Sequence, residues 1–471
     1  MTRTITEPSR QTPVRAEVDV LVCGGGLGGV SAAVASARAG AKTLLVERNG
    51  FPGGVATAGA CCSVFNCLYT PSHELAVRGN ALEFVDALAR ADGSGPNWHD
   101  HKGHIIHDLE RAKLTLIDLL EDAGADYLFD APAAGVLMEE DALLGVCIES
   151  KSGREAVLAK TVVDATGDAD IAHLSGAPVR TTGAWAKHSY PFRVGGVDVD
   201  AFVQYFADHP DQYPPYMDID WDLDGALAHY EATGTLLFPH GGGIQMDLIR
   251  RGLESGEYPE TVGVQSACAA LQMHAIRDLG AVHMITGWCE IEDLDVAQIT
   301  RAMTDGKRMA YAVTDYFRKH VPGFASAHVD ALADDLGIRA SRWIEGEFDF
   351  TGEMKKQETR FADAVGVGVV QHDFKKSDAP GAWGCQTFKD ETYDIPYRCL
   401  VPKGVDGLLM GAGRSVSQEN PMLLRVMALT MVTGQAAGVG AAVSADTNAS
   451  PRATDIAAIQ SELKRQGVNL P

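Results

Sequence analysis

The sequence has few basic residues for its length. Its 471 residues include 40 Lys and Arg against 63 Asp and Glu, which gives a formal net charge of −23. Such a negative field repels phosphate backbones and anionic lipid surfaces, so neither nucleic acid nor a membrane surface is an expected partner. The expected partner is a small-molecule substrate, and self-association into a homo-oligomer is left open.

No segment that would direct the chain out of the cytoplasm is expected from the sequence. Residues 1–17 are polar, contain two prolines and have no apolar core of a signal peptide, so residues 1–15 are predicted to be a disordered tail. Residues 426–443 are the longest weakly polar stretch, but their glutamine, glycines and threonines predict a buried helix. Nine cysteines, an odd number, do not indicate a disulfide framework. These features predict a cytoplasmic protein with free thiols.

What the sequence does have is clustered glycine and enough apolar residues for a large core. Fifty residues are glycine and 46% of the chain is hydrophobic. Glycine clusters of this kind favour close approach of the backbone to a ligand. The densest cluster lies between an apolar strand at 18–23 and a helix at about 30–39, and a second strand follows at 42–46. Together they predict a strand–turn–helix–strand unit.

The turn of this unit carries the pattern Gly24-x-Gly26-x-x-Gly29. Gly24 permits a tight turn, Gly26 lets the backbone approach a pyrophosphate, and Gly29 lets the helix pack closely on the strand. The helix N-terminus then directs free N–H groups at the phosphates. Glu47 ends the second strand, where a carboxylate can accept the hydroxyls of an adenosine ribose. The unit predicts a dinucleotide site, although the glycine pattern itself does not distinguish FAD from NAD.

Three further segments favour FAD, namely 48–54, 162–168 and 407–417. No second complete Gly-x-Gly-x-x-Gly unit occurs in the sequence, so a separate NAD(P)H domain is not expected. With these motifs the chain resembles the FAD-dependent oxidoreductases of the glutathione-reductase-type flavoprotein fold. The resemblance covers nearly the whole chain and includes four more motifs, at 336–342, 395–398, 425–427 and 433–438.

The resemblance implies a set of residues that contact FAD. The set is Gly24, Gly26, Gly28, Gly29, Glu47, Arg48, Gly53, Gly54, Thr166, Gly167, Asp168, Gly413, Arg414 and Leu424. In the family, a helix beginning near 422–424 would direct its N-terminus at the flavin N1–C2=O locus. Two departures stand out. Arg414-Ser415 occupies the place of an Asp found in many flavoproteins, and the segment 339–343 lacks the Glu of the usual family motif.

Catalytic candidates come from the segment expected to cover the flavin. His188 is the first choice for a base, ahead of His240 and His283, although a structural histidine is the more common case for each. Arg342 and Arg398 are candidate clamps for an anionic substrate because a guanidinium matches a carboxylate in two hydrogen bonds. An internal salt bridge is an equally good interpretation of both arginines.

Two other clusters are weaker candidates. The spacing of four histidines at 99, 101, 104 and 107 fits neither a zinc finger nor a helical pair, so no metal site is expected. Cys62 and Cys67 have the spacing of a redox-active pair in disulfide reductases, and Cys61 adjoins them. They lie in a predicted strand rather than a helix, so buried thiols are the better interpretation.

The predicted fold is α/β, with a Rossmann-like doubly wound FAD-binding domain and an inserted mixed α+β substrate domain. The FAD-binding domain is expected at 16–180 and 395–448, the substrate domain at 181–394 and a last helix at 449–471. The predicted function is an FAD-dependent dehydrogenase or oxidase that transfers a hydride from a small organic substrate to flavin N5. A flavin-dependent monooxygenase and a non-catalytic flavin-binding scaffold are the alternatives.

Overall fold

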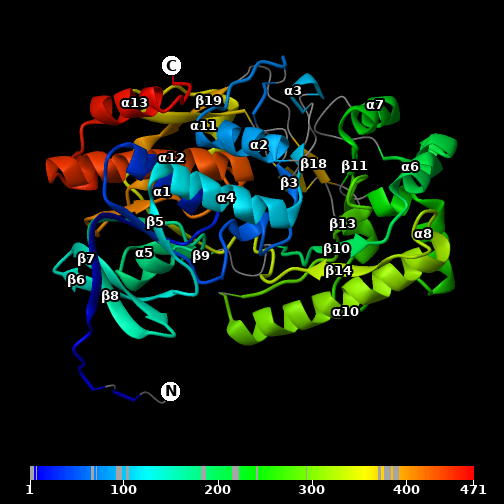
Figure 1. Ribbon diagram of the computed structural model, residues 1–471, viewed down its shortest axis with the longest axis horizontal. Helices are drawn as coiled ribbons and strands as arrows, with labels where there is room; N and C mark the ends of the chain where they lie inside the picture. Colours follow the sequence, from blue (N-terminus) through cyan, green and yellow to red (C-terminus); the bar gives the residue numbers. More distant parts are fainter. Residues whose placement is uncertain are drawn as a thin grey trace.

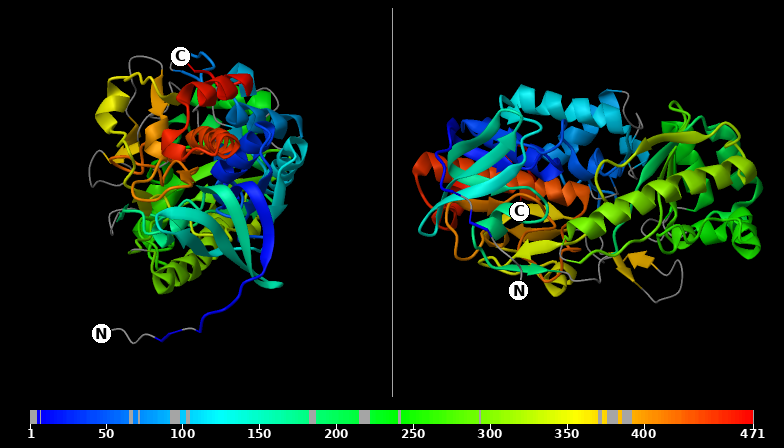
Figure 2. Two further views of the ribbon diagram at one scale, coloured as in Figure 1. Left: turned by 90° about the vertical axis from the view of Figure 1, so that its left-hand side faces the viewer. Right: turned by 90° about the horizontal axis from the view of Figure 1, so that it is seen from below.

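The computed structural model describes residues 5–6, 8–64, 68–70, 72–91, 98–101, 105–181, 187–214, 222–239, 242–292, 294–369, 373–375, 383–385 and 392–470. Two bodies lie side by side along its long axis (Figures 1 and 2). We call them the main domain, which contains both chain ends, and the cap domain, which is built around residues 187–339. Each has its own apolar core.

A seven-stranded sheet forms the centre of the main domain, in the order β5-β2-β1-β8-β7-β6, with β20 also paired to β8. Its strands are β1 (Val14–Cys23), β2 (Thr43–Val46), β5 (Asp126–Leu128), β6 (Ala133–Glu139), β7 (Ala142–Ser150), β8 (Gly153–Asp164) and β20 (Leu408–Met410). Strands β5, β2, β1, β8 and β20 are parallel, as a doubly wound fold requires. The last four residues of β1 are fully buried because both sheet faces are covered.

Strand β8 joins the antiparallel part of the sheet to its parallel part. Its first half pairs antiparallel with β7, and its last residues, Val162–Asp164, pair parallel with β20. Strand β5 pairs parallel with β2 at one edge of the sheet. Strand β1 begins at Val14 because Val14 pairs with Ala156, so the predicted tail ends before residue 15.

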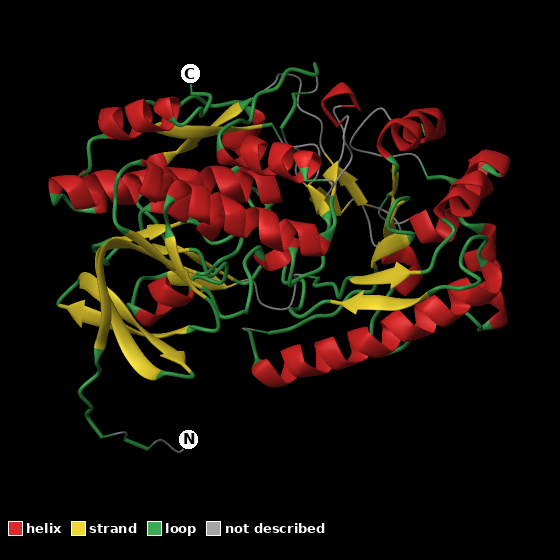
Figure 3. Cartoon of the chain, viewed as in Figure 1, coloured by secondary structure: helices red, strands yellow, loops and turns green. Residues whose placement is uncertain are grey.

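Most helices of the main domain lie together beside its sheet (Figure 3). The helices of this domain are α1 (Leu27–Arg38), α2 (Asn80–Arg90), α3 (Trp98–His101), α4 (Leu109–Ala123), α5 (Asp170–Leu174), α11 (Gly352–Lys356), α12 (Met427–Thr447) and α13 (Ile456–Arg465). Helix α4 is capped at both ends: Asp108 accepts two backbone N–H groups at its start, and Gly124 has φ +75° at its end.

Helices α1 and α12 pack with their backbones almost in contact. A Cβ atom on Gly434 or Gly438 would overlap the carbonyl oxygens of Gly28 and Ala32, and Ser31 Oγ donates a hydrogen bond of 2.7 Å to the Met431 carbonyl. Among the described helices, only α12 has the length and hydropathy of a membrane span. However, 89% of its apolar window is buried inside the protein, which is also typical of a core helix.

The cap domain is a five-stranded antiparallel sheet with helices on its outer face. The strand order is β11-β12-β13-β10-β14. The strands are β10 (Phe192–Gly195), β11 (Thr235–Phe238), β12 (Gln272–Ile276), β13 (Ala281–Ile285) and β14 (His328–Leu332), and the helices are α6 (Val199–Asp208), α7 (Leu223–Thr233), α8 (Asp247–Ser255), α9 (Ala267–Ala270) and α10 (Val296–His320). Long helix α10 runs along the sheet and contributes Met309, Val313 and Phe317 to the cap core (Figure 1).

The chain after the cap returns to the main domain earlier than the predicted limit at 394. Strand β15 (Arg342–Ile344) pairs with β9 (Val179–Thr181), and β16 (Ala364–Gly368) pairs with β19 (Tyr393–Pro396). Ile344, Phe350 and Val365 belong to the main core. The remaining two-stranded sheets are β3 (Ser63–Val64) with β4 (Ile105–Ile106) and β17 (Asp373–Lys375) with β18 (Trp383–Cys385). Exact domain limits stay a prediction, and the packing favours about 187–339 for the insertion.

Candidate cofactor site

The glycine turn between β1 and α1 is held by tight backbone packing at several of its glycines. Gly24 has φ +101°, and a Cβ atom there would lie 2.6 Å from the Ala165 carbonyl oxygen. A Cβ atom on Gly29 would overlap the Gly24 carbonyl oxygen, and one on Gly28 would overlap that of Gly411. These three glycines are therefore required by the protein's own packing.

Gly26 is different, because nothing in the described protein requires it to be glycine. Its φ of −62° and ψ of 175° suit any residue, and Gly54 Cα, at 3.9 Å, is the only described heavy atom that a Cβ atom on Gly26 would meet within 4 Å. It is the N-cap residue of α1 and offers no side chain to the N–H groups of the first turn. Open space beside unsatisfied N–H groups at a helix N-terminus is suited to a pyrophosphate.

Glu47 follows β2 and is almost fully buried. One carboxylate oxygen accepts the Gly25 N–H at 2.5 Å and the other accepts the Asn49 N–H at 2.8 Å. Burial raises the pKa of the Glu47 carboxyl above its usual value, although both N–H groups oppose this shift. Each oxygen keeps a lone pair, so the carboxylate can still accept two ribose hydroxyls.

The second glycine pair lies directly beside the first turn. The Gly53 N–H donates to the Gly25 carbonyl at 2.8 Å, and a Cβ atom on Gly54 would lie 2.9 Å from Gly26 Cα. The structure therefore brings together 24–29 and 53–54, two segments that the resemblance assigns to FAD contact. Arg48 is mostly exposed and pairs at 2.7 Å with Asp335, a residue of the segment that leaves the cap and one that sequence reasoning did not identify.

The turn after β8 is organised by a buried carboxylate. Asp164 is fully buried and accepts hydrogen bonds from the Thr166 hydroxyl at 2.7 Å, the Thr166 N–H at 3.1 Å and the Ala172 N–H at 3.0 Å. The Thr166 hydroxyl in turn accepts the Asp170 N–H at 3.0 Å. Thr166 therefore shapes the turn, and Gly167, with φ +85°, directs the chain toward Asp168.

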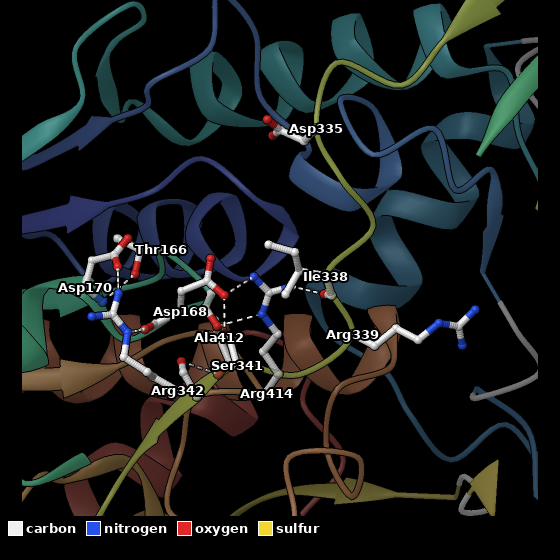
Figure 4. Close-up of polar contacts among 12 residues, drawn as sticks. Thr166, Asp168, Asp170, Asp335, Ile338, Arg339, Ser341, Arg342, Ala412 and Arg414 are labelled. Carbon is white, nitrogen blue, oxygen red and sulfur yellow. Dashed lines mark hydrogen bonds and ion pairs between the residues drawn. The ribbon is translucent and has the colours of Figure 1, made fainter. Parts of the chain in front are cut away.

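Figure 4 shows that Arg414 and Asp168 face each other at the edge of this turn. Arg414 binds the Asp168 carboxylate at 2.8 Å, the Gly167 carbonyl at 2.6 Å and the Ile338 carbonyl at 2.5 Å. Ser341 also donates to Asp168. Arg414 thus joins three chain segments, which gives a physical reason for arginine where many flavoproteins have an aspartate.

Arg342 has a similar bridging position. It donates to the Asp168 carbonyl at 3.0 Å and forms an ion pair with Asp170. Burial and the neighbouring carboxylates of Asp168 and Asp164 raise the pKa of Asp170 to about 6, while Arg342 opposes the shift. The guanidinium is directed at a carboxylate of the protein, so the geometry favours the salt-bridge interpretation of Arg342.

Gln418 is a structural residue that sequence reasoning missed. Its side chain is fully buried, donates to the Gly413 carbonyl at 2.7 Å and accepts the Leu424 N–H at 3.2 Å. It therefore closes the loop that carries Gly413, Arg414 and Leu424. Helix α12 begins after this loop, at Met427, a few residues beyond the start near 422–424 that the resemblance implies. No short motif in the sequence signals these contacts.

His188 lies at the boundary between cap and main domain. It is buried, its backbone bridges to Cys289, and its Nδ1 accepts the Arg339 N–H at 3.2 Å. Burial lowers the pKa of His188 to about 4, and the charges of Arg339 and Arg414 add to this effect. The neutral ring therefore carries its proton on Nε2. A small cavity here is lined by Thr181, His188, Ile291, Leu294, Ala340, Ser341 and Arg342.

The other candidates have ordinary structural surroundings. Arg398 binds Asp363 through two nitrogens, at 2.9 and 3.3 Å, and its guanidinium lies over the Phe348 ring. Among the described residues, the one hydrogen-bond partner of the His107 ring is the Ala56 carbonyl, at 3.0 Å. No group of metal ligands occurs in the part of the chain that is described.

The cysteines also favour the interpretation as buried thiols over that as a redox-active pair. Seven cysteines are free, and they include Cys61, Cys62 and Cys289. Burial raises the pKa of the Cys62 thiol well above its usual value, which disfavours the reactive thiolate. Cys67, His104 and His240 lie outside the described residues, so the predicted roles at these positions stay predictions.

Comparison with known proteins agrees with this geometry. The family model described as FAD dependent oxidoreductase matches residues 19–463. A search of curated proteins found no match. One similar solved structure is a geranylgeranyl bacteriochlorophyll reductase-like protein from Thermoplasma acidophilum, which is 16% identical, with 96% of this chain and 84% of that chain covered and a TM-score of 0.41.

Two further similar structures are monooxygenases by their descriptions. The p-nitrophenol 4-monooxygenase of Pseudomonas putida is 12% identical over 95% of this chain and 84% of that chain, with a TM-score of 0.44. The anhydrotetracycline hydroxylase of Streptomyces rimosus is 12% identical over 96% and 66%, with a TM-score of 0.42. Similarities this low carry no argument about activity. The family match does, because it spans nearly the whole chain and includes an open cradle at Gly26 and a buried acid at Glu47 that both fit FAD. The chain belongs to the FAD dependent oxidoreductase family.

Proposed function

We propose that this enzyme oxidises a small organic substrate bound between the main domain and the cap. FAD, when bound, accepts a hydride at N5 from a substrate C–H bond. The observation that carries the proposal is the position of His188, a buried neutral histidine beside Arg414 and Asp168 at the boundary of the two domains. A polar group that has been removed from water at a cofactor site is a candidate for substrate contact.

The chain's own residues would divide the work between cofactor and substrate. The turn at 24–29 and Glu47 hold the nucleotide end of FAD. Arg414 ties the turn after β8 to the segment that leaves the cap, because it binds both Gly167 and Ile338. This contact fixes the position of the cap relative to the cofactor.

We propose that His188 acts as a hydrogen-bond donor rather than as the base first expected from the sequence. Its Nδ1 is already an acceptor for the Arg339 N–H, so proton removal from substrate at Nδ1 would break that bond. Its Nε2–H remains available to a substrate oxygen. A pKa of about 4 also makes the ring a weak base at neutral pH.

An anaerobic screen tests the proposal. Purified holoenzyme is mixed without oxygen with alcohols, amines and acids, and the loss of the visible absorbance of oxidised flavin is recorded. Bleaching by one substrate class supports the dehydrogenase or oxidase activity. Oxygen use that requires NADPH and is coupled to hydroxylation would instead identify a monooxygenase. Bound FAD that no substrate and no NADPH reduces would identify a non-catalytic scaffold.

The remaining predictions concern the surroundings of the enzyme. A cytoplasmic location, a small-molecule substrate as the main partner, the absence of nucleic-acid and membrane partners, and self-association as an open alternative all stay predictions. They rest on the net charge of −23 and on the sequence features described above.

A further inference from the structure

The two faces of the cap sheet have different chemistry. Side chains alternate along a strand, so Met273 and Ala275 of β12 share one face with Val282 and Met284 of β13. These four residues belong to the cap core, which α10 covers. The opposite face carries Gln272, His274 and Ile276 of β12 and Ala281, His283 and Ile285 of β13.

This second face is turned toward the main domain, and we call it the inner face. Leu237 of β11, which pairs with His274, packs in one cluster with Cys62, Ile106 and Leu109 of the main domain. Cys62 Sγ lies 3.6 Å from His274 Nδ1. On β10, Arg193 pairs with His283 in the sheet register and binds Asp108, at the start of α4, at 2.9 Å. The inner face is therefore enclosed between the two domains.

Two side chains on the inner face are buried with unused hydrogen-bonding groups. Gln272 and His283 are both fully buried. Within the described part of the chain, neither the amide nitrogen and oxygen of Gln272 nor the two ring nitrogens of His283 have a hydrogen-bond partner. Because His274 pairs with His283 and Gln272 is two residues before it, the two side chains are diagonal neighbours, about 7–8 Å apart.

Burying these polar groups without partners lowers the stability of the folded protein unless a ligand supplies the missing hydrogen bonds. A buried amide or imidazole without a partner destabilises a protein, and native proteins rarely keep one without a reason. The nearby Arg193 does not supply these hydrogen bonds, because it is engaged by both Asp108 and Asp330. On the facing main domain, His107 is also buried and its Nδ1 has no partner among the described residues.

We propose that Gln272 and His283 form the polar recognition site for the substrate, and that this site selects a neutral group containing both a hydrogen-bond donor and an acceptor. The inference rests on the proposed function, which places substrate between cap and main domain. A carboxamide, a lactam or a phenol has this chemistry.

The class of substrate follows from what the two side chains can do. The Gln272 amide both donates and accepts, and a neutral imidazole does the same. Burial, together with Arg193 and His107, lowers the pKa of His283 well below its usual value, so the ring is uncharged at neutral pH. Arg193, the cation beside this face, is already neutralised, so a carboxylate substrate would be buried without a counter-charge from it, which is unfavourable.

A matched pair of glutamine variants in the holoenzyme tests the site. Gln272→Met removes the unused amide while preserving volume. Gln212→Met is the control, because Gln212 is a buried cap residue whose oxygen accepts the Asp247 N–H at 2.8 Å and the Tyr205 hydroxyl. We expect the melting temperature of the Gln272→Met enzyme to be unchanged or higher by about 2–4 °C, and that of Gln212→Met to fall.

Binding is measured by calorimetric titration with benzamide and benzoate, which share a ring and differ in the charge of the polar group. We expect the parent enzyme to prefer benzamide, and Gln272→Met or His283→Leu to weaken benzamide binding at least about tenfold. Gln212→Met should keep parental affinity at temperatures where it is folded.

Three results would overturn the site: equal benzamide binding by parent and Gln272→Met, a parent that prefers benzoate or binds neither probe, or a loss of melting temperature in Gln272→Met equal to that of the control. The proposed function fails separately. If benzamide binding depends on Gln272 but no compound in the anaerobic screen reduces the flavin, the site stands and the oxidation does not. If Gln272→Met oxidises a substrate with parental kcat and KM, the site alone fails.

Discussion

Gly26→Ala should separate cofactor binding from folding. Gly24, Gly28 and Gly29 are required by packing, but the backbone angles of Gly26 suit alanine, and a Cβ atom there would stand in open space, with Gly54 Cα at 3.9 Å. The added methyl group would therefore touch little of the protein. It would occupy the space where the pyrophosphate approaches the N-terminus of α1.

The magnitude follows from the bonds that would be lost. Displacing the pyrophosphate from the helix N-terminus removes about two charge-assisted hydrogen bonds, each worth roughly 1.5–3 kcal/mol. At about 1.4 kcal/mol per factor of ten, FAD affinity should fall by about 10²–10⁴-fold. The apoprotein should change little in stability, because the roughly 0.4–1 kcal/mol gained by restricting the unfolded chain is offset by about 1 kcal/mol from the poorer N-cap preference of alanine.

The assay measures two quantities on protein stripped of flavin. FAD binding is followed by the quenching of flavin fluorescence, and stability by denaturant unfolding. Gly29→Ala is the structural contrast, since its methyl group would overlap the Gly24 carbonyl oxygen and should destabilise the apoprotein. Gly352→Ala is the neutral control, because the nearest atom to its Cβ atom would be the Glu419 carboxylate at 3.6 Å. The reasoning is refuted if Gly26→Ala keeps parental FAD affinity while its apoprotein is destabilised.

Three further predictions concern charged or titratable residues. Glu47→Gln should lower FAD affinity at least about tenfold in the same fluorescence titration, because an amide cannot accept the ribose hydroxyls as a carboxylate does; unchanged affinity would place the adenosine elsewhere. His188→Asn can still accept the Arg339 N–H but lacks the Nε2 donor, so stopped-flow reduction should slow while stability is kept, and His188→Gln should show the reverse; equal rates in both would exclude the donor role. The folded pKa of Asp170 is about 6, above the ordinary 3.8, so its ionisation opposes folding. The contribution of Asp170 to stability should therefore be full below pH about 4 and lost as pH rises through about 6, and Asp170→Asn should remove this part of the pH dependence of unfolding; an unchanged pH profile would contradict the assigned shift.

Sequence reasoning was most successful where function depends on local backbone geometry. The turn at 24–29 and the acid at Glu47 follow from short-range rules, and the structure brings 24–29, Glu47 and 53–54 together. The family match confirms the FAD-dependent oxidoreductase prediction and the cofactor.

It was least successful where a side chain meets a partner far along the chain. Arg342 pairs with Asp170, 172 residues away, and Arg414 with Asp168, 246 residues away. From the sequence, Arg342 could equally have bound a substrate and Arg414 was expected to contact FAD, and only the fold decides which carboxylate lies within reach. Nothing in the sequence indicated a role for Gln272. What marks Gln272 is that its side chain is buried without a hydrogen-bond partner among the described residues, and glutamine is usually exposed, so its burial is not predicted from residue type.

The close packing of α1 on α12 has a consequence for how the protein is made. Ten of the twelve residues of α1 are buried, and much of the surface that covers them belongs to a helix that the ribosome adds about 400 residues later. While the cap is being translated, the nucleotide-binding turn and α1 have already emerged, but α12, the helix that packs against α1, has not yet been made. We therefore expect FAD to bind only near the end of synthesis, and the apolar surface of α1 to be accessible to chaperones until then.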